Sequence, residues 1–244
     1  MHELGHTRSA NRRDHLLHTP DTFVRTPMLG IERGMAIVHI SPAAGAGFTQ
    51  YTAELEPGGT LAPAATQRFV YVLSGAANLA SDSSFNSLSA GSYAYLPATP
   101  AHTLTAQQTT RLAVIEKPYQ PLDGTPAPTL VTGIETNILS TPLMGDPDLQ
   151  VRALLPDDPS FDFAVNTMTY QPGASLSMVE VHVMEHGLLM LEGGGIYRLS
   201  DAWYPVTAGD FIWMAPFCPQ WFGVLGKQPA KYLIYKDWNR SPLG

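Results

Sequence analysis

The sequence predicts an all-β protein built from two similar barrel-like units, and two observations lead to this expectation. Glycine and proline number 21 each among 244 residues, and they separate many short runs rich in Val, Ile, Tyr, Phe and Leu. Short strands punctuated in this way are typical of β-sandwiches and barrels. One order of strands and turns also occurs twice along the chain. Helix is therefore expected to be sparse.

The N-terminal part of the chain holds the first copy of this order. Residues 1–20 are polar and are expected to form an arm, and residues 23–39 should supply the first ordered strands. Residues 48–61 indicate a strand, a Pro-Gly turn and the start of another strand. Residues 163–176 repeat this arrangement with the same Pro-Gly turn, 115 residues later.

Two further landmarks recur at one shared spacing. A strand that ends at Gly75 matches a strand that ends at Gly193, and the Ala-Gly turn at Gly91 matches the one at Gly209. Both pairs are 118 residues apart, which indicates an internal duplication. The prolines between the copies indicate a linker. The predicted organisation is an arm at 1–20, an N-terminal unit at 21–120, a proline-rich linker at 121–142 and a C-terminal unit at 143–244.

The composition favours a globular protein that acts on a small molecule. Hydrophobic residues make up 44% and charged residues 14%, and no apolar run reaches the ~18 residues that cross a bilayer. The net charge is −7 with scattered Lys and Arg, which argues against a nucleic-acid partner. The polar N-terminus shows no signal peptide, and Cys218 is the single cysteine, so we expect a cytoplasmic location and no membrane partner. A homo-oligomer is also expected.

The C-terminal unit carries a candidate metal site. Glu180, His182 and His186 have even numbers, so on an extended segment their side chains would point to one face. A carboxylate and two imidazoles suit a divalent ion such as Mn, Fe, Ni or Zn. A single histidine is more often structural, so the prediction rests on the triplet. A fourth ligand must come from elsewhere.

The order of elements in both units resembles that of cupins, whose barrels are double-stranded β-helices (jelly rolls). The chain is thus expected to be a bicupin, with two such barrels. The second cupin motif runs from Gly209 to Gln220 and places Gln220 where the last metal ligand stands. The commonest cupin set is His, His, Glu and His, whereas the order here is Glu, His, His and Gln. Because an amide oxygen is a weaker donor than imidazole, Mn²⁺ is expected ahead of Zn or Cu.

The N-terminal unit lacks these ligands, and its metal site is expected to be degenerate. The residues opposite the three ligands, in two possible alignments, are Ala62, Ala64 and Arg68, or Ala65 and Gln67 for the first two. His102 alone remains, opposite Gln220. One ligand does not hold a catalytic metal, so this unit is expected to be a structural partner.

The chain resembles the (S)-ureidoglycine aminohydrolase family, most strongly from Tyr170 to Arg240. The resemblance rests on the ligand order, on the Gly-Gly-Gly-Ile-Tyr stretch ending at Tyr197 and on the ending Tyr-Leu-Ile-Tyr-Lys-Asp-Trp-Asn-Arg from Tyr232. It extends to residues 12–17 and the Pro-Gly-Gly turn at Pro57. Members of this family are bicupins of purine catabolism that use Mn to release ammonia from ureidoglycine, leaving ureidoglycolate.

The resemblance implies a set of site residues. The implied metal ligands are Glu180, His182, His186 and Gln220; the implied substrate contacts are Glu180, Tyr197, Gln220, Tyr232 and Lys236, of which Glu180 and Lys236 are catalytic. Strand parity places Tyr232, Ile234 and Lys236 on one face. Burying a lysine there is costly unless it meets an anion. Lys236 could hold the substrate carboxylate or transfer protons, and both roles stay open.

Other functions fit parts of the pattern. One is a cupin-type Fe dioxygenase or isomerase that acts on another small polar acid, and Gln220 argues against it only weakly. Another is a non-enzymatic ligand-binding bicupin, which would suit the degenerate N-terminal unit. The complete ligand set in the C-terminal unit favours an enzyme over this second alternative.

Overall fold

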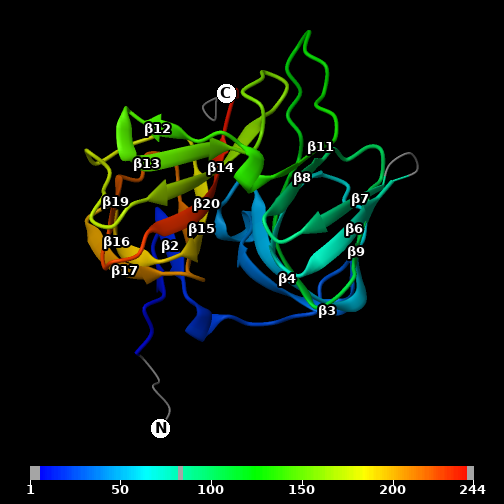
Figure 1. Cartoon of the computed structure of the whole chain (residues 1–244), viewed down its shortest axis with the longest axis horizontal. Coiled ribbons are helices and arrows are strands. Elements are labelled where there is room, and N and C mark those ends of the chain that lie inside the picture. The colour runs from blue at the N-terminus through cyan, green and yellow to red at the C-terminus, as the bar shows by residue number, and fades with distance from the viewer. Residues whose placement is uncertain (1–5, 82–84, 241–244) are drawn as a thin grey trace. The chain divides into compact units, whose positions relative to one another are not determined.

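The computed structural model describes residues 6–81 and 85–240. The chain folds as an all-β protein with two compact units, which confirms the predicted fold class (Figure 1). Of the described residues, one unit contains 6–23, 139–157 and 163–240, and we call it the C-terminal unit. The other contains 24–81, 85–138 and 158–162, and we call it the N-terminal unit.

The N-terminal unit is built on one curved antiparallel sheet. Among the described residues the strand order is β11-β8-β5-β10-β4-β9-β6-β7, and β3 pairs with β4. The elements of this unit are β3 (Ile31–Ile40), the 3-10 turn η2 (Pro42–Ala44), β4 (Thr49–Leu61), β5 (Gln67–Ser74), β6 (Ala76–Ala80), β7 (Phe85–Ser89), β8 (Ser92–Leu96), β9 (Thr103–Ala106), β10 (Thr110–Lys117), β11 (Val131–Ile134) and the 3-10 turn η3 (Glu135–Asn137). Alternate residues of its central strands point inward to a core that includes Tyr51, Val70 and Leu112.

The C-terminal unit combines a large antiparallel sheet with a small one. Their strand orders are β1-β2-β18-β15-β20-β14-β13-β12 and β17-β16-β19. The elements are β1 (Ala10–Asn11), β2 (His15–His18), the 3-10 turn η1 (Pro20–Thr22), β12 (Thr141–Leu143), β13 (Asp146–Ala153), β14 (Phe163–Tyr170), β15 (His186–Glu192), β16 (Gly194–Leu199), β17 (Ala202–Thr207), β18 (Phe211–Met214), β19 (Gln220–Val224) and β20 (Ala230–Asp237). A core containing Leu188, Tyr197 and Phe222 fills the space between the sheets.

The segment expected to be a polar arm contributes two strands to the C-terminal unit. β2 pairs with β18, and Leu17 is fully buried in the core. Arg8 holds this segment by two hydrogen bonds to the buried carboxylate of Asp210, with N–O distances of 2.5 and 2.9 Å. Asp210 also accepts a hydrogen bond from the backbone nitrogen of Thr207. The side chains of β2, His-Leu-Leu-His, alternate between buried and half-buried, as expected for a strand that covers a sheet edge.

The proline-rich segment expected to be a linker also contains strands. Its β11 pairs with β8 in the N-terminal unit, whereas β12 pairs with β13 in the C-terminal unit. Further on, residues 158–162 return to the N-terminal unit, where the buried Asp162 accepts hydrogen bonds from Gln67 (2.7 Å) and from the backbone of Gln120 (2.9 Å). These pairings assign the segments of the chain to one unit or the other. They depend on residues far apart in the sequence, so the local composition does not predict them.

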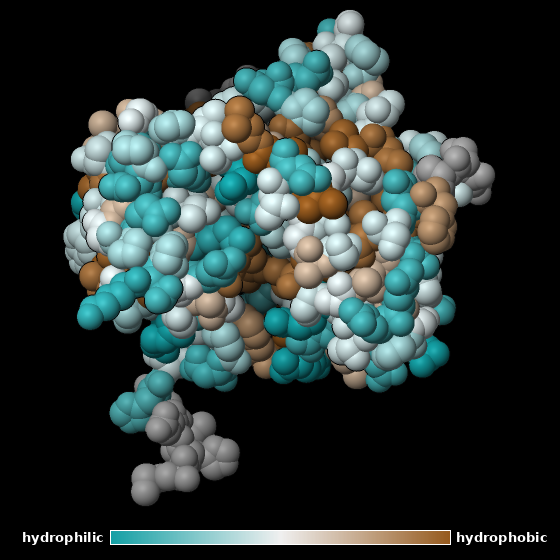
Figure 2. All heavy atoms as spheres, viewed as in Figure 1, coloured by the Kyte–Doolittle hydropathy of each residue, from teal (hydrophilic) through white to brown (hydrophobic). Residues whose placement is uncertain are grey.

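Hydrophilic and intermediate residues cover most of the face that is in view in Figure 2. This distribution agrees with the burial of the large apolar side chains in two cores. Within the described residues, no helix has the length and apolar character that a membrane span requires.

Replacing Arg8 by Met should lower the free energy of unfolding of the C-terminal unit by about 1–3 kcal/mol, because the buried Asp210 would lose a charged partner. All four tryptophans lie in this unit, so urea denaturation followed by tryptophan fluorescence measures it. The exposed Arg12, whose guanidinium donates to the carbonyl of its neighbour Asn11, gives the control Arg12→Met, expected within about 0.5 kcal/mol of the unchanged protein. Equal unfolding of both variants would contradict the anchoring role of Arg8.

Candidate metal centre

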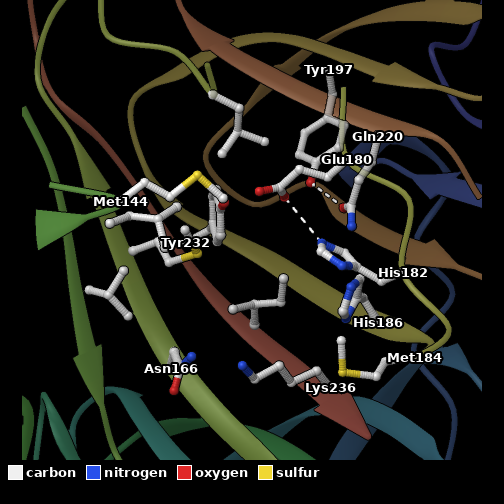
Figure 3. Close-up of a pocket in the computed structure, with 15 residues that line it drawn as sticks. Met144, Asn166, Glu180, His182, Met184, His186, Tyr197, Gln220, Tyr232 and Lys236 are labelled. Carbon is white, nitrogen blue, oxygen red and sulfur yellow. Dashed lines mark hydrogen bonds and ion pairs between the residues drawn. The ribbon is translucent and has the colours of Figure 1, made fainter. Parts of the chain in front are cut away.

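The C-terminal unit encloses a cavity of about 210 Å³ between its sheets. It brings together all seven side chains that the sequence singled out (Figure 3). The lining residues are Leu143, Met144, Val151, Asn166, Met168, Leu176, Glu180, His182, Met184, His186, Tyr197, Gln220, Tyr232, Ile234 and Lys236. Most of the wall is apolar, and the polar groups gather in a few places, as in many small-molecule sites.

Glu180 and His182 reach the cavity from a loop, which corrects the expectation of one extended segment through the three residues. Residues 181–185 form no strand, and His186 is the first residue of β15. Glu180 instead forms an isolated antiparallel bridge with Gln220, with N–O distances of 2.8 and 2.9 Å. The carbonyl of His182 accepts a hydrogen bond from the backbone of Phe217 at 2.6 Å. The backbone hydrogen bonds of this loop with Gln220 and Phe217 therefore bring the side chains together, and strand parity does not explain their positions.

The four expected ligands lie close to one another. His182 Nε2 is 3.2 Å from Glu180 Oε2, and the rings of His182 and His186 have centroids 5.4 Å apart. Gln220 begins β19 and is joined to Glu180 by the backbone bridge. One carboxylate, two imidazoles and one amide oxygen thus face a common region of the cavity (Figure 3). This donor set suits a divalent cation.

Among the four expected ligands, His186 has the surroundings that give the strongest evidence for a bound cation. It is buried, and its Nδ1 has no hydrogen-bond partner among the described residues. Burial, with smaller effects of His182 and Lys236, lowers the pKa of His186 to about 3. The ring is therefore neutral near pH 7 and carries a free lone pair. A buried acceptor without a partner costs free energy unless another group meets it, and a metal ion would supply that group.

The amide of Gln220 is held by Tyr197. The Tyr197 hydroxyl donates to Gln220 Oε1 at 3.1 Å, and both side chains are buried. Burial raises the pKa of Tyr197 well above its usual value, so the phenol stays a donor. β16 and β19 can approach because Gly195 has no side chain; a Cβ there would lie 2.1 Å from the Gly223 carbonyl oxygen. The close approach fixes the distance over which Tyr197 reaches Gln220.

Tyr232 and Lys236 enter the cavity from β20 together with Ile234, as their parity predicted. The Tyr232 hydroxyl is 2.7 Å from that of Tyr170, and both phenols are buried. Lys236 is half-buried, and its Nζ lies 3.9 Å from the centroid of the Trp238 ring. Burial lowers the pKa of Lys236, whereas the charges of nearby carboxylates raise it. Among the described residues no carboxylate comes within ion-pair distance of this ammonium group.

Asn166 is a polar residue of the cavity that the sequence reasoning missed. It lies on β14, half-buried, and lines the cavity with Met168. The signal was present, because Asn166 shares its strand face with Met168 and Tyr170 and is thus a carboxamide on an apolar face. Its side chain makes no hydrogen bond within the part of the chain that the structure describes.

In the N-terminal unit, an ion pair occupies the two strand positions that correspond to His186 and Lys236 in the cavity of the C-terminal unit. Arg68 pairs with Glu116 across β5 and β10, just as His186 pairs with Lys236 across β15 and β20. Arg68 Nε donates to Glu116 Oε1 at 2.7 Å, and the guanidinium is buried. His102 shares a small hollow with Arg68. A buried cation at this position repels a metal ion, which supports the expectation of a degenerate site.

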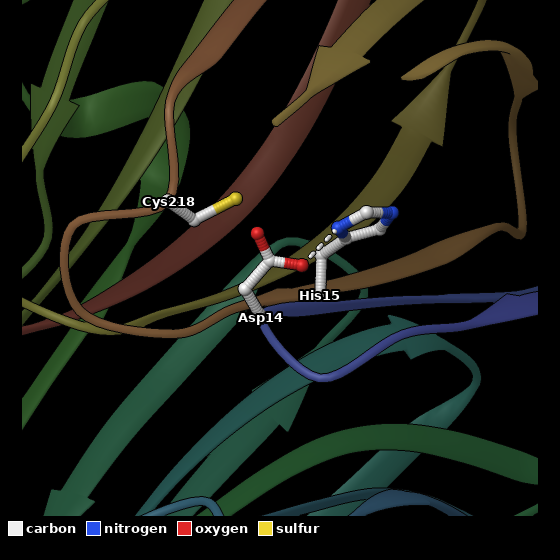
Figure 4. A group of neighbouring side chains, drawn as sticks. All are labelled: Asp14, His15 and Cys218. Carbon is white, nitrogen blue, oxygen red and sulfur yellow. Dashed lines mark hydrogen bonds and ion pairs between the residues drawn. The ribbon is translucent and has the colours of Figure 1, made fainter. Parts of the chain in front are cut away.

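Asp14, His15 and Cys218 form a second cluster of metal-binding side chain types, with their ligand atoms within 4.8 Å of one another (Figure 4). The sequence reasoning did not find this cluster. His15 Nδ1 is 2.9 Å from Asp14 Oδ1, and its Nε2 is 2.8 Å from the Tyr204 hydroxyl. Burial raises the pKa of Cys218 to about 11, so the thiol stays protonated. With both ring nitrogens engaged, the cluster fastens β2 to the segment before Gln220.

Comparison with known proteins identifies cupin domains in both halves of the chain. The Cupin domain family matches residues 166–235, and the EutQ-like cupin domain family matches residues 42–119. A rice protein described as a probable (S)-ureidoglycine aminohydrolase is 43% identical over 98% of this chain and 78% of its own length. The (S)-ureidoglycine aminohydrolase of Arabidopsis thaliana is also 43% identical, over 98% of this chain and 80% of its own length. The crystal structure of a putative glyoxylate-induced protein from Pseudomonas aeruginosa is 29% identical, covers 98% of this chain and 94% of its own, and superposes with a TM-score of 0.87.

Proposed function

Because the chain belongs to the (S)-ureidoglycine aminohydrolase family, we propose that it hydrolyses (S)-ureidoglycine to ureidoglycolate and ammonia in purine catabolism, with Mn²⁺ as its cofactor. The observation that carries this proposal is the convergence of Glu180, His182, His186 and Gln220 at a cavity that also contains Lys236, whose ammonium group lies against the Trp238 ring and has no carboxylate partner among the described residues. The substrate has an α-carboxylate, an α-amine and a ureido group on one carbon, so its charges suit such a cavity.

The metal would be held by Glu180, His182, His186 and Gln220. The orphaned, neutral ring nitrogen of His186 and the short distance between Glu180 and His182 support this assignment. A bound divalent ion supplies a Lewis acid that stabilises negative charge in the transition state. Tyr197 keeps the Gln220 oxygen in place by its hydrogen bond. Buried support of this kind sets how well the ligands are oriented.

The reaction replaces the carbon–nitrogen bond to the α-amine by a carbon–oxygen bond from water. The water must lose a proton and the leaving amine must gain one. We assign proton transfer to Glu180, whose carboxylate faces the cavity beside His182. Lys236 is assigned to the substrate side, either as the anchor of the carboxylate or as a second proton carrier. Tyr232, held by Tyr170, completes the wall against which the substrate would lie.

The proposal also includes a cytoplasmic homo-oligomer. Exposed apolar side chains on the C-terminal unit, Met178 (57% exposed), Val181 (55%) and Trp203 (58%), are compatible with contacts between copies. Multi-angle light scattering of the purified protein tests this part, and a monomer at micromolar concentration would contradict it.

Purified protein loaded with Mn²⁺ should release ammonia from freshly generated ureidoglycine faster than the spontaneous reaction. Coupled detection of ammonia, with chiral analysis of the ureidoglycolate formed, measures this activity. Protein treated with a chelator should lose the activity and regain it with Mn²⁺. Ammonia release at the spontaneous rate by the metal-loaded protein would rule out the proposed function.

Replacing His186 by Ala should remove both the bound metal and at least about 100-fold of the activity, since one of four ligands is lost. Gln220→Ala should be milder because a neutral amide is the weakest donor of the set. Elemental analysis should find one Mn per chain in the unchanged protein. The matched control is His102→Ala in the N-terminal unit, which should leave metal content and activity nearly intact. Full Mn occupancy with normal turnover in His186→Ala would contradict the assignment of His186 as a metal ligand.

Lys236→Met should leave the metal bound and the barrel folded, while activity falls by a factor of tens to thousands. Methionine keeps most of the side chain's length but removes the charge. A change mainly in KM would identify a carboxylate anchor, and a change mainly in kcat with an altered pH profile would identify proton transfer. The control is Lys231→Met on the same strand, where the lysine pairs with Glu192 at 2.7 Å. Unchanged kinetics of Lys236→Met would show that this lysine does not meet the substrate.

A further inference from the structure

We propose that Asn166 is the residue of the cavity that recognises the ureido group of the substrate. This inference rests on the proposed function and names a contact that the expected ligand and substrate residues do not supply. Those residues provide a cation site, phenols and an ammonium group. Among the described groups that line the cavity away from the metal ligands, the carboxamide of Asn166 is the one that offers a donor atom and a separate acceptor atom in one plane, whereas each phenol uses a single oxygen for both.

The strand register places Asn166 next to Lys236. On the neighbouring antiparallel strands β14 and β20, Ala164 stands opposite Lys236 and Asn166 stands opposite Ile234. Asn166 and Lys236 are therefore diagonal neighbours on one face, within reach of long side chains. Figure 3 shows both of them on the side of the cavity away from Glu180 and Gln220. The cavity thus has a second polar region besides the metal ligands.

The polar atoms of this second region are free to meet a ligand. Asn166 makes no hydrogen bond, and Lys236 no ion pair, with any other residue that the structure describes. Around them the wall is apolar, with Met168, Ile234 and Val151. Because apolar side chains flank this amide, a bound molecule that displaces water from it must provide hydrogen bonds in its place, or binding loses free energy. The arrangement is hence that of a specific polar contact in a mostly apolar pocket.

The two side chains differ in what they can recognise. An ammonium group only donates, so Lys236 matches a carboxylate. A carboxamide donates through Nδ2 and accepts through Oδ1, so it can pair with the C=O and the terminal NH₂ of a ureido group at once. A divalent ion and an ammonium group would both accept many amino acids. Asn166 would restrict the site to substrates with a carbamoyl group, because a ligand lacking it leaves the amide unpaired.

Two substrate analogues separate these contacts. N-carbamoylglycine carries the ureido group and the carboxylate but no α-amine, so it binds without reacting. N-acetylglycine has a methyl group in place of the terminal NH₂. Binding of both to the Mn-loaded protein can be measured by calorimetry. The unchanged protein should bind N-carbamoylglycine about tenfold more tightly, which is the usual effect of one buried hydrogen bond.

Asn166→Leu, which keeps the size of the side chain, should abolish this tenfold preference and leave the affinity for N-acetylglycine within about threefold of its original value. Asn166→Ala is the second variant, in case leucine does not fit the cavity wall. Lys236→Met should weaken both analogues to a similar extent and keep the preference. Thr169→Val, an odd-numbered position on β14 whose side chain is not part of the cavity wall, is the control and should change neither affinity.

Every outcome of these binding measurements either supports or overturns the role of Asn166. A preference that survives in folded Asn166→Leu and Asn166→Ala overturns it, and so does an equal loss of both analogues, which would mean that Asn166 holds the carboxylate. An unchanged protein that binds both analogues equally, or binds neither, also overturns it. Failure of the proposed function is seen separately, because it would show as absent ammonia release from ureidoglycine in a protein that still prefers N-carbamoylglycine.

Discussion

The site depends on a pair of backbone hydrogen bonds between Glu180 and Gln220, 2.8 and 2.9 Å long. These bonds tie the loop that carries two expected ligands to the first residue of β19, which carries another. The segment between β14 and β15 is also held by the Ser175–Gly223 bridge and by the hydrogen bond from the backbone of Phe217 to the carbonyl of His182, but the Glu180–Gln220 bridge joins two expected ligands directly. A surface loop with so few regular contacts is held by a small number of such bonds, so each matters for the geometry of the ligands.

Much of the remaining structure in the C-terminal unit supports this bridge. β2, from the start of the chain, pairs with β18, and the carbonyl of Asp14 accepts a hydrogen bond from the backbone of Ala215. The cluster of Asp14, His15 and Cys218 then fastens the strand beside the segment that leads to Gln220. Side chains of types that bind metals thus have a positioning role here, because His15 already bonds Asp14 and Tyr204, and the Cys218 thiol donates to the carbonyl of Pro219.

The two units share a strand register but carry different side chains at the corresponding positions. The same register that pairs His186 with Lys236 pairs Arg68 with Glu116. In the C-terminal unit, Nδ1 of His186 has no hydrogen-bond partner and the ammonium group of Lys236 has no carboxylate partner among residues 6–81 and 85–240, so both can meet a ligand. In the N-terminal unit the guanidinium and the carboxylate neutralise each other at 2.7 Å. A site that binds must keep its polar groups unsatisfied by the protein, at a cost in stability.

The sequence by itself determined the all-β class and the duplication, because glycine and proline turns and repeated spacings are local properties. Seven of the side chains that line the cavity followed from the family resemblance, and the shared face of Tyr232, Ile234 and Lys236 followed from their parity. Parity did not hold for Glu180 and His182, since they lie in a loop whose partner is 40 residues away at Gln220. The sequence also did not show where the segment expected to be an arm packs, and in the structure its strand β2 pairs with β18. Asn166 stood in a strand of apolar and small polar residues without any motif around it. The pairing of β14 with β20 places Asn166 beside Lys236. The sequence does not show this, because contacts between distant strands depend on the register that the folded sheet adopts.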